Sequence, residues 1–169
     1  MREEKGNKKE RNLKKSFLRL FLVVLIIFWT IFVYGLSHQT GTESSGLSRK
    51  IAGIFFKSEE MIDTFEPIIR KLAHFSEYAL GGFLFYSLFS TYTYTIKQKS
   101  IISLALGIWY ASLDEIHQLF IPGRSGNVID VGIDSLGVLF GILFSIVFYK
   151  IIQNINIKLK ERQEERKSE

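Results

Sequence analysis

The span from Tyr110 to Asp134, YASLDEIHQLFIPGRSGNVIDVGID, sets ionisable groups on both sides of a Pro-Gly turn, between two strongly apolar segments. A charged residue at the centre of a membrane helix costs roughly 2.5–3.5 kcal/mol, whereas each Leu or Ile returns only about 0.3–0.6 kcal/mol. Burying the four carboxylates without partners would consume most of what two helices gain; these are Asp114, Glu115, Asp130 and Asp134. We therefore expect these groups to face one another, water and a cation in a polar pocket inside a membrane bundle.

The fold class follows from the apolar stretches. The chain has 169 residues and is 47% hydrophobic, which is too apolar for a disordered protein. A bilayer core of about 30 Å requires about 20 helical residues. We predict an all-α, polytopic membrane bundle with four transmembrane helices, over 17–36, 72–90, 101–121 and 127–149. Apolar residues between the first two recur at helical spacing among charged ones, which predicts short amphipathic interfacial helices able to cover the pocket.

These predictions divide the chain into a basic tail at 1–16, a membrane domain at 17–149 with an outer loop at 37–66, and a charged tail at 150–169. The outer loop begins with SHQTGTESSGLSRK, whose Ser, Thr and Gly content is typical of an irregular segment. Pro67 suits the first turn of the second transmembrane helix, where its missing N–H would have no partner anyway.

The placement of charge predicts the topology. Of the 22 Lys and Arg residues, 16 lie on one side, in the two tails, at Arg19 near the start of the first helix, and between the second and third helices, and 6 lie on the opposite side. The positive-inside rule then places both termini in the cytoplasm and the polar pocket toward the outer face of the cell membrane. The net charge of +5 is thus explained by topology, and we expect no nucleic-acid partner. The chain has no cysteine, which excludes disulfides and thiolate metal sites.

Small residues recur at helix-packing spacing in two places. Gly107 precedes Ala111 by four residues, and Gly137 precedes Gly141 by four. Such pairs allow helices to approach closely in lipid. They predict packing within the bundle, although the Gly137 and Gly141 pair equally suits a dimer face, so the sequence leaves the oligomeric state open.

Polar residues of three helices fall at one depth, because each lies within about 12 Å of the outer end of its helix at 1.5 Å per residue. Helical spacing also gathers them on single faces. The three inward polar stripes are Lys71, His74 and Tyr78, then Asp114 and Gln118, and then Asn127, Asp130 and Asp134. Glu77 and Glu115 border the same region, whereas His117 lies further round its helix.

The segments KLAHFSEYALGGFL and DEIHQLFIPGRSGNVIDVGIDSLGVLFG resemble the VanZ-like family of integral membrane proteins, named for a teicoplanin-resistance protein. The shared pattern is K-x-x-H-F-x-E-Y on one helix, then D-E-x-x-Q-x-F-x-P-x-R and D-x-x-x-[N/D] around the next turn. The family's polar positions fall on Lys71, His74, Glu77, Tyr78, Asp114, Glu115, Gln118, Arg124 and Asp130. Asp134 departs from the pattern, since the family is associated with Asn there. The resemblance implies a role at the bacterial cell envelope, with low-level glycopeptide resistance in the namesake, but it brings no established reaction.

Two functional hypotheses follow from the pocket. In the first, the pocket binds or helps to modify an envelope component, with Lys71 and Arg124 holding phosphate or carboxylate groups of a lipid-linked cell-wall precursor or a glycopeptide. In the second, the protein is a membrane enzyme acting on such a lipid. Glu77 or Asp114 would then serve as general acid or base, His74 as proton shuttle, and Arg124 as the stabiliser of negative charge.

Two further possibilities are weaker. A metal variant of the enzyme would use His74, Glu77, Asp114 and Asp130, but no tight metal-binding motif is present, so we predict neither metal nor cofactor. In a purely structural alternative, the cations pair with the carboxylates only to lock helix register. The expected partners are membrane lipids and the envelope ligand.

Overall fold

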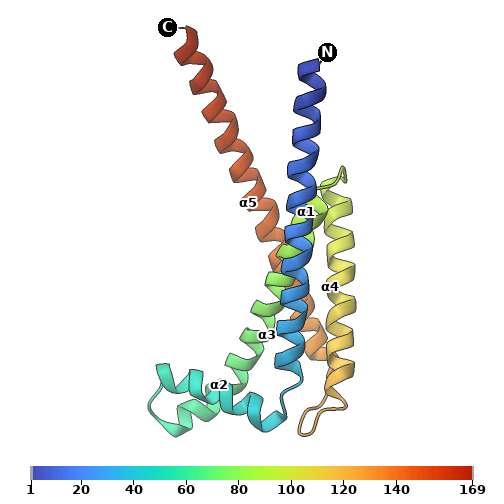
Figure 1. Cartoon of the computed structure of the whole chain (residues 1–169). Helices are drawn as coiled ribbons and strands as arrows, with labels where there is room; N and C mark the ends of the chain where they lie inside the picture. Colours follow the sequence, from blue (N-terminus) through green and yellow to red (C-terminus); the bar gives the residue numbers. More distant parts are fainter. Residues whose placement is uncertain (1, 169) are drawn as a thin grey trace.

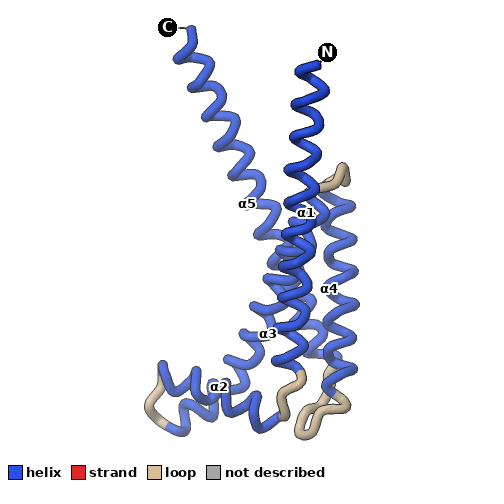
Figure 2. The backbone as a smooth tube through the Cα atoms, viewed as in Figure 1, coloured by secondary structure: helices blue, strands red, loops and turns tan. Residues whose placement is uncertain are grey.

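The computed structural model describes residues 2–168, with side chains described for 6–7 and 9–166. Within this part of the chain the fold is entirely helical, without strands, as the sequence predicts (Figures 1 and 2). The five helices are α1 (Arg2–Ser37), α2 (Gly41–Phe55), α3 (Glu59–Ser90), α4 (Ile96–Gln118) and α5 (Val128–Ser168).

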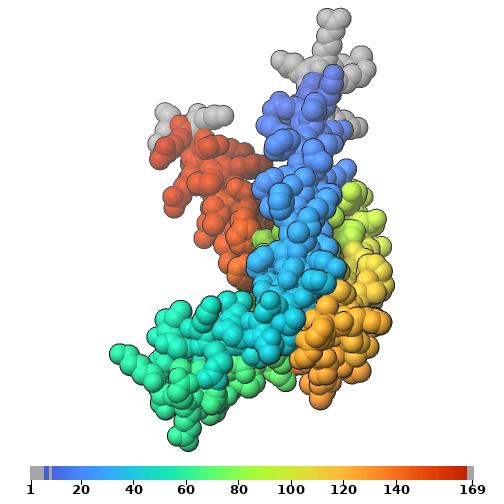
Figure 3. Space-filling view, turned by 60° about the horizontal axis from the view of Figure 1, so that its bottom comes forward, coloured from blue at the N-terminus to red at the C-terminus, as the bar shows by residue number. Residues whose placement is uncertain are grey.

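Four of these helices form an elongated bundle, with both termini at one end (Figure 1). The contact between α3 and α5 is the most extensive, α4 packs on α5 and on α3, and α1 lies against α3 and α4. The helix α2 and the start of α3 project sideways at the opposite end, next to the turn between α4 and α5 (Figures 1 and 3). The predicted tail at 150–169 is the continuation of α5, exposed over its described residues.

An aromatic cluster holds α1, α3 and α4 together. The ring of Trp29 lies 6.1 Å from Tyr78 in an edge-to-face arrangement and 4.9 Å from Tyr110. The Trp29 indole N–H donates a 2.8 Å hydrogen bond to the backbone carbonyl of Glu77, and the Tyr110 hydroxyl donates to the carbonyl of Thr30. Aromatic residues therefore join the three helices through both ring contacts and polar ends.

The small residues are packing contacts, as predicted. A Cβ atom on Gly137 would overlap the carbonyl of Phe75, and one on Gly141 would overlap the carbonyl of Ala79. Both overlaps are with the backbone of α3 in the same chain. The structure therefore does not support a dimer face at Gly137 and Gly141, because α3 covers both residues.

Two local predictions are wrong. The expected loop after the first helix is helical from Gly41, because Thr40 and Glu43 form a capping box. In it, each side chain accepts a hydrogen bond from the other residue's backbone N–H, which satisfies donors that a helix start leaves unpaired. The second correction concerns Pro67, which lies inside α3 rather than in its first turn, since α3 already begins at Glu59.

The helices differ in whether their length and hydropathy suffice to cross a membrane. Two segments, Lys9–Ser37 in α1 and Val128–Arg166 in α5, are long and apolar enough by length and composition. Helices α3 and α4 are not among them, because the polar residues of the pocket lower their mean hydropathy. Large apolar side chains such as Phe28, Trp109 and Phe140 are exposed on the outside of the bundle. These features favour a membrane protein, while the number of crossings stays a prediction.

Candidate functional site

A polar cavity of about 90 Å³ lies at the end of the bundle away from the termini, between α3, α4, α5 and the α4–α5 turn. Among the predicted site residues, those lining it are Lys71, His74, Glu115, Gln118, Arg124, Asp130 and Asp134. Glu77, Tyr78 and Asp114 lie beside the cavity and do not line it. No residue of α2 lines it either, so the expectation that interfacial helices cover the pocket is not met.

The mouth of the cavity carries an ion pair between two helices. The Lys71 ammonium of α3 lies 3.7 Å from a carboxylate oxygen of Asp130 on α5. The Lys71 side chain is 51% exposed and that of Asp130 is 33% exposed. A partly hydrated pair at this distance contributes little to stability, so Lys71 remains available to an incoming anion.

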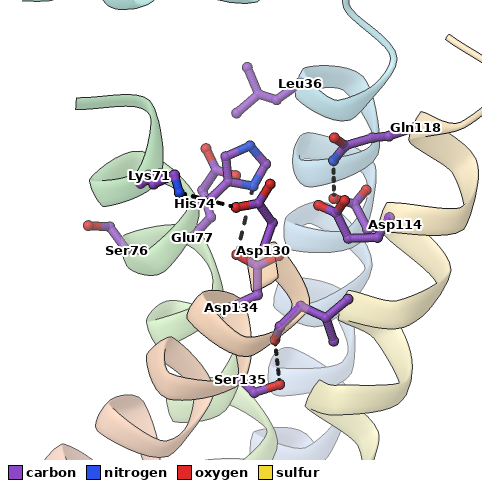
Figure 4. A network of polar contacts seen from close by, with 12 residues as sticks. Leu36, Lys71, His74, Ser76, Glu77, Asp114, Gln118, Asp130, Asp134 and Ser135 are labelled. Carbon is purple, nitrogen blue, oxygen red and sulfur yellow. Dashed lines mark hydrogen bonds and ion pairs between the residues drawn. The ribbon is translucent and has the colours of Figure 1, made fainter. Parts of the chain in front are cut away.

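The inner part of the cavity is more acidic and more buried (Figure 4). Asp134 of α5 is fully buried, and neither of its carboxylate oxygens has a hydrogen-bond partner among the described residues. His74 Nδ1 lies 3.8 Å from Asp134 Oδ1. On α4, Gln118 donates a 3.1 Å hydrogen bond to Oδ2 of the buried Asp114. Three helices thus contribute carboxylate or imidazole groups to one small region.

Arg124 connects the α4–α5 turn to the end of α1. Its guanidinium donates hydrogen bonds of 3.3 and 3.1 Å to the carbonyls of Leu36 and Ser37, which belong to the last turn of α1. Those carbonyls have no partner within their own helix. Nη2 of Arg124 also lies 3.4 Å from His74 Nε2. Burial lowers the pKa of Arg124 below its ordinary value, and the like charge of Arg70 lowers it further. Two guanidinium groups therefore converge near the cavity.

The turn itself depends on glycine. Gly123 has φ +74°, in the left-handed region that glycine adopts without strain. Its backbone closely faces Gly41, so a Cβ on Gly41 would overlap the Gly123 carbonyl, and the Gly41 N–H donates a 3.1 Å hydrogen bond to the Pro122 carbonyl. The start of α2 thereby contacts the turn that carries Arg124.

Three predicted residues are buried or half-buried between the helices. The buried Glu115 accepts a 2.8 Å hydrogen bond from the backbone N–H of Asn127, just before α5 begins. Tyr78 is fully buried among aromatic rings, and its hydroxyl has no hydrogen-bond partner among the described residues. Glu77 is half-buried beside His74 (Figure 4). The roles that we predict for these residues stay predictions.

The sequence reasoning missed four residues of the cavity wall, of which Arg70 and Ser125 have polar side chains and Gly123 and Ile133 do not. A signal for Arg70 existed, because it precedes His74 by four residues and therefore shares its helix face. Ser125 lies in the turn, where no periodicity applies. His117, which we placed further round its helix, lies outside the cavity and stacks on His38.

The arrangement suits recognition of a group with both anionic and hydroxyl or amine parts. Guanidinium and ammonium groups bind phosphate and carboxylate through charge-assisted hydrogen bonds. The carboxylates beside them accept hydrogen bonds from hydroxyl and amine groups. A cavity of about 90 Å³ holds a head group rather than a whole lipid.

Comparison with known protein families matches residues 21–151 of this chain to the family described as VanZ/LLP1. The match includes α3 and α4, the parts of α1 and α5 that fall within 21–151, and every predicted site residue, and it confirms the resemblance seen in the sequence. No curated protein and no solved structure matches the chain. Because the matched segment makes up most of the 169 residues, the chain belongs to the VanZ/LLP1 family.

Proposed function

We propose that the cavity binds the phosphate head group of a lipid-linked component of the cell envelope. The observation that carries this proposal is that Arg70 lines the cavity without a partner among the described residues. Its half-buried side chain lines the cavity, and within the described part of the chain it makes no hydrogen bond or ion pair. A guanidinium presents five N–H donors that match phosphate geometry, so an anion in the cavity would satisfy them.

The surrounding charges support the same ligand class. Arg70 and Arg124 both line the cavity and repel each other, and after burial this repulsion is the second cause that lowers the pKa of Arg124. Lys71 adds a third cation, whose contact with Asp130 is long. A bound phosphate would relieve the repulsion, while Asp130 could accept hydrogen bonds from a sugar attached to that phosphate.

An apolar groove supports a lipid rather than a soluble phosphate. A depression of about 360 Å³ lies between α3 and α5, the two helices that carry most of the cavity wall. It is lined almost entirely by apolar atoms, from Ala79, Leu80, Phe83, Phe140, Gly141 and Phe144. A hydrocarbon chain there would gain about 25 cal/mol for each Å² removed from water, and less where the groove already faces lipid.

The experiment compares two ligands and two variants in nanodiscs that contain the full chain. A polyprenyl phosphate should bind more tightly than the same polyprenol without phosphate, and inorganic phosphate at millimolar concentration should compete weakly. Arg70→Gln removes an unpaired cation, so folding should be unaffected. A lost hydrogen bond to a charged group is worth about 1.5–3 kcal/mol, which corresponds to about a 10- to 100-fold weaker binding of the phosphate lipid.

Lys57→Gln provides the matched control, because Lys57 is an exposed cation between α2 and α3 and does not line the cavity. It should leave binding unchanged. Equal binding of the two lipids by the wild-type protein would refute the proposal. An equal loss in both variants would indicate general electrostatic attraction instead of a specific site.

We extend the proposal to topology, with four membrane crossings, cytoplasmic termini and a cavity toward the outer face. The absence of cysteine makes the chain a ready background for labelling. In intact cells, a membrane-impermeant maleimide should label Lys57→Cys and spare Lys97→Cys, which lies in the first turn of α4. Labelling of both positions, or of Lys97→Cys alone, would contradict this arrangement.

We further propose that binding of the envelope lipid gives low-level glycopeptide resistance of the teicoplanin type. Cells that express the wild-type protein should be less susceptible than cells with Arg70→Gln at matched membrane abundance. Mass spectrometry of their envelope lipids separates binding from catalysis. Unchanged lipids would support a binding module, whereas a product that depends on Asp114 would favour the enzyme alternative.

A further inference from the structure

Three side chains from three different helices meet beneath the cavity. His74 of α3, Asp114 of α4 and Asp134 of α5 each offer one nitrogen or oxygen atom, and these atoms all lie within 4.8 Å of one another (Figure 4). The set differs from that of the metal variant weighed from the sequence, because Asp134 takes part, whereas Glu77 does not and Asp130 is turned to Lys71. Sequence spacing alone could not separate the two carboxylates, which lie on one face of α5.

The second observation is the missing partner of Asp134. Its side chain is fully buried, yet both oxygens lack a hydrogen bond among the described residues. His74 Nδ1 is also buried without a partner, and it lies 3.8 Å from Asp134 Oδ1, which is beyond hydrogen-bond length. Buried polar atoms in proteins are almost always satisfied. One cation between the three residues would satisfy all of these atoms together.

We infer that His74, Asp114 and Asp134 bind a divalent cation of the Mn²⁺ or Zn²⁺ type. One imidazole and two carboxylates suit borderline to hard divalent ions. At bond lengths of about 2.1 Å, two ligands of one ion lie about 3–4 Å apart. The observed separations therefore require side-chain movement of about 1 Å or less and no movement of the helices.

Neighbouring residues would orient the ligands. Gln118 donates a hydrogen bond to Oδ2 of Asp114 and so helps to fix the orientation of that carboxylate. If His74 binds the ion through Nδ1, the ring proton lies on Nε2, which then cannot accept from Arg124. The 3.4 Å contact between them would open and release one Arg124 nitrogen toward the cavity. Supporting contacts of this kind commonly fix ligand orientation around protein-bound metals. The inference does not depend on the proposed lipid ligand.

The test uses the purified full chain in detergent, stripped with EDTA and titrated with Mn²⁺. Electron paramagnetic resonance of free Mn²⁺ and calorimetry report binding, and Zn²⁺ should compete. The wild-type protein should bind one ion. Asp134→Asn, which preserves side-chain shape, should weaken Mn²⁺ binding at least 30-fold, in line with the loss of one of three ligands and its charge.

Asp130→Asn is the matched control, because it removes a carboxylate from the same cavity and the same helix without touching the three-residue cluster. Its affinity for Mn²⁺ should fall less than about threefold, from the loss of a nearby charge. Thermal unfolding without metal separates misfolding from ligand loss. Under these metal-free conditions Asp134→Asn should be at least as stable as the wild-type protein, since it removes a buried charge. Added Mn²⁺ should stabilise the wild-type protein.

Two results would overturn the inference. One is an absence of stoichiometric Mn²⁺ or Zn²⁺ binding by the wild-type protein at millimolar ion concentration. The other is equal weakening by Asp130→Asn and Asp134→Asn, which would indicate diffuse attraction to the acidic cavity. Neither result bears on phosphate-lipid binding, whose test relies on Arg70.

Discussion

The contact between α3 and α5 positions most of the cavity wall, and Gly141→Ala should disrupt it. The added methyl carbon would lie 2.8 Å from both the carbonyl carbon of Ala79 and the backbone nitrogen of Phe83, whereas ordinary contacts begin at 3.4 Å. Backbone atoms cannot rotate away, so the helices must separate locally by at least about 0.6 Å. A gap of that size forfeits about a quarter or more of the dispersion energy of the atoms involved.

Overpacking of this kind typically costs about 1–3 kcal/mol. Alanine also forms helix more readily than glycine, by about 1 kcal/mol, and this gain offsets part of the destabilisation that the overlap causes. Gly132→Ala on the same helix isolates that contribution, because nothing lies within 4 Å of a Cβ at Gly132. We therefore expect Gly141→Ala to be about 1–3 kcal/mol less stable than Gly132→Ala.

The assay is SDS titration of the detergent-solubilised protein, followed by the fluorescence of Trp29 in the core and by far-UV circular dichroism. Light scattering of the native samples would report their mass. Equal stability of Gly141→Ala and Gly132→Ala would refute the packing argument. A change in mass without a change in unfolding would mean that Gly141 contacts a second chain instead of α3.

Two further substitutions test other contacts. Trp29→Phe keeps most of the ring packing and removes the hydrogen bond to the Glu77 carbonyl, so it should cost about 0.5–1.5 kcal/mol in the SDS titration followed by circular dichroism; no loss would mean that this bond contributes nothing. Thr40→Ala removes the capping box of α2 and should cost about 0.5–2 kcal/mol of local helix stability. Amide hydrogen exchange should then accelerate within Gly41–Phe55 and stay unchanged in α5, and Thr40→Ser should restore protection, whereas uniform acceleration would contradict a local role.

Local information explains why so much of the site was predictable. The depth of a residue along a helix and the face on which it lies depend only on its position in that helix, at about 1.5 Å and 100° per residue. His74, Gln118 and Asp130 were therefore expected near one another before any packing was known. The same information failed at Gly41, where two residues of a capping box outweighed a composition typical of loops.

The sequence by itself determined the helical class, the family and the three polar stripes, because each is encoded by hydropathy, spacing or motif within a short segment. Only the tertiary structure decided how each polar residue is used. Glu115 meets the start of α5, Arg124 meets the end of α1, and Asp134 is buried beside His74 while Asp130 pairs with Lys71. These outcomes depend on the rotation and separation of helices distant in sequence, which packing of whole surfaces sets and no single segment encodes.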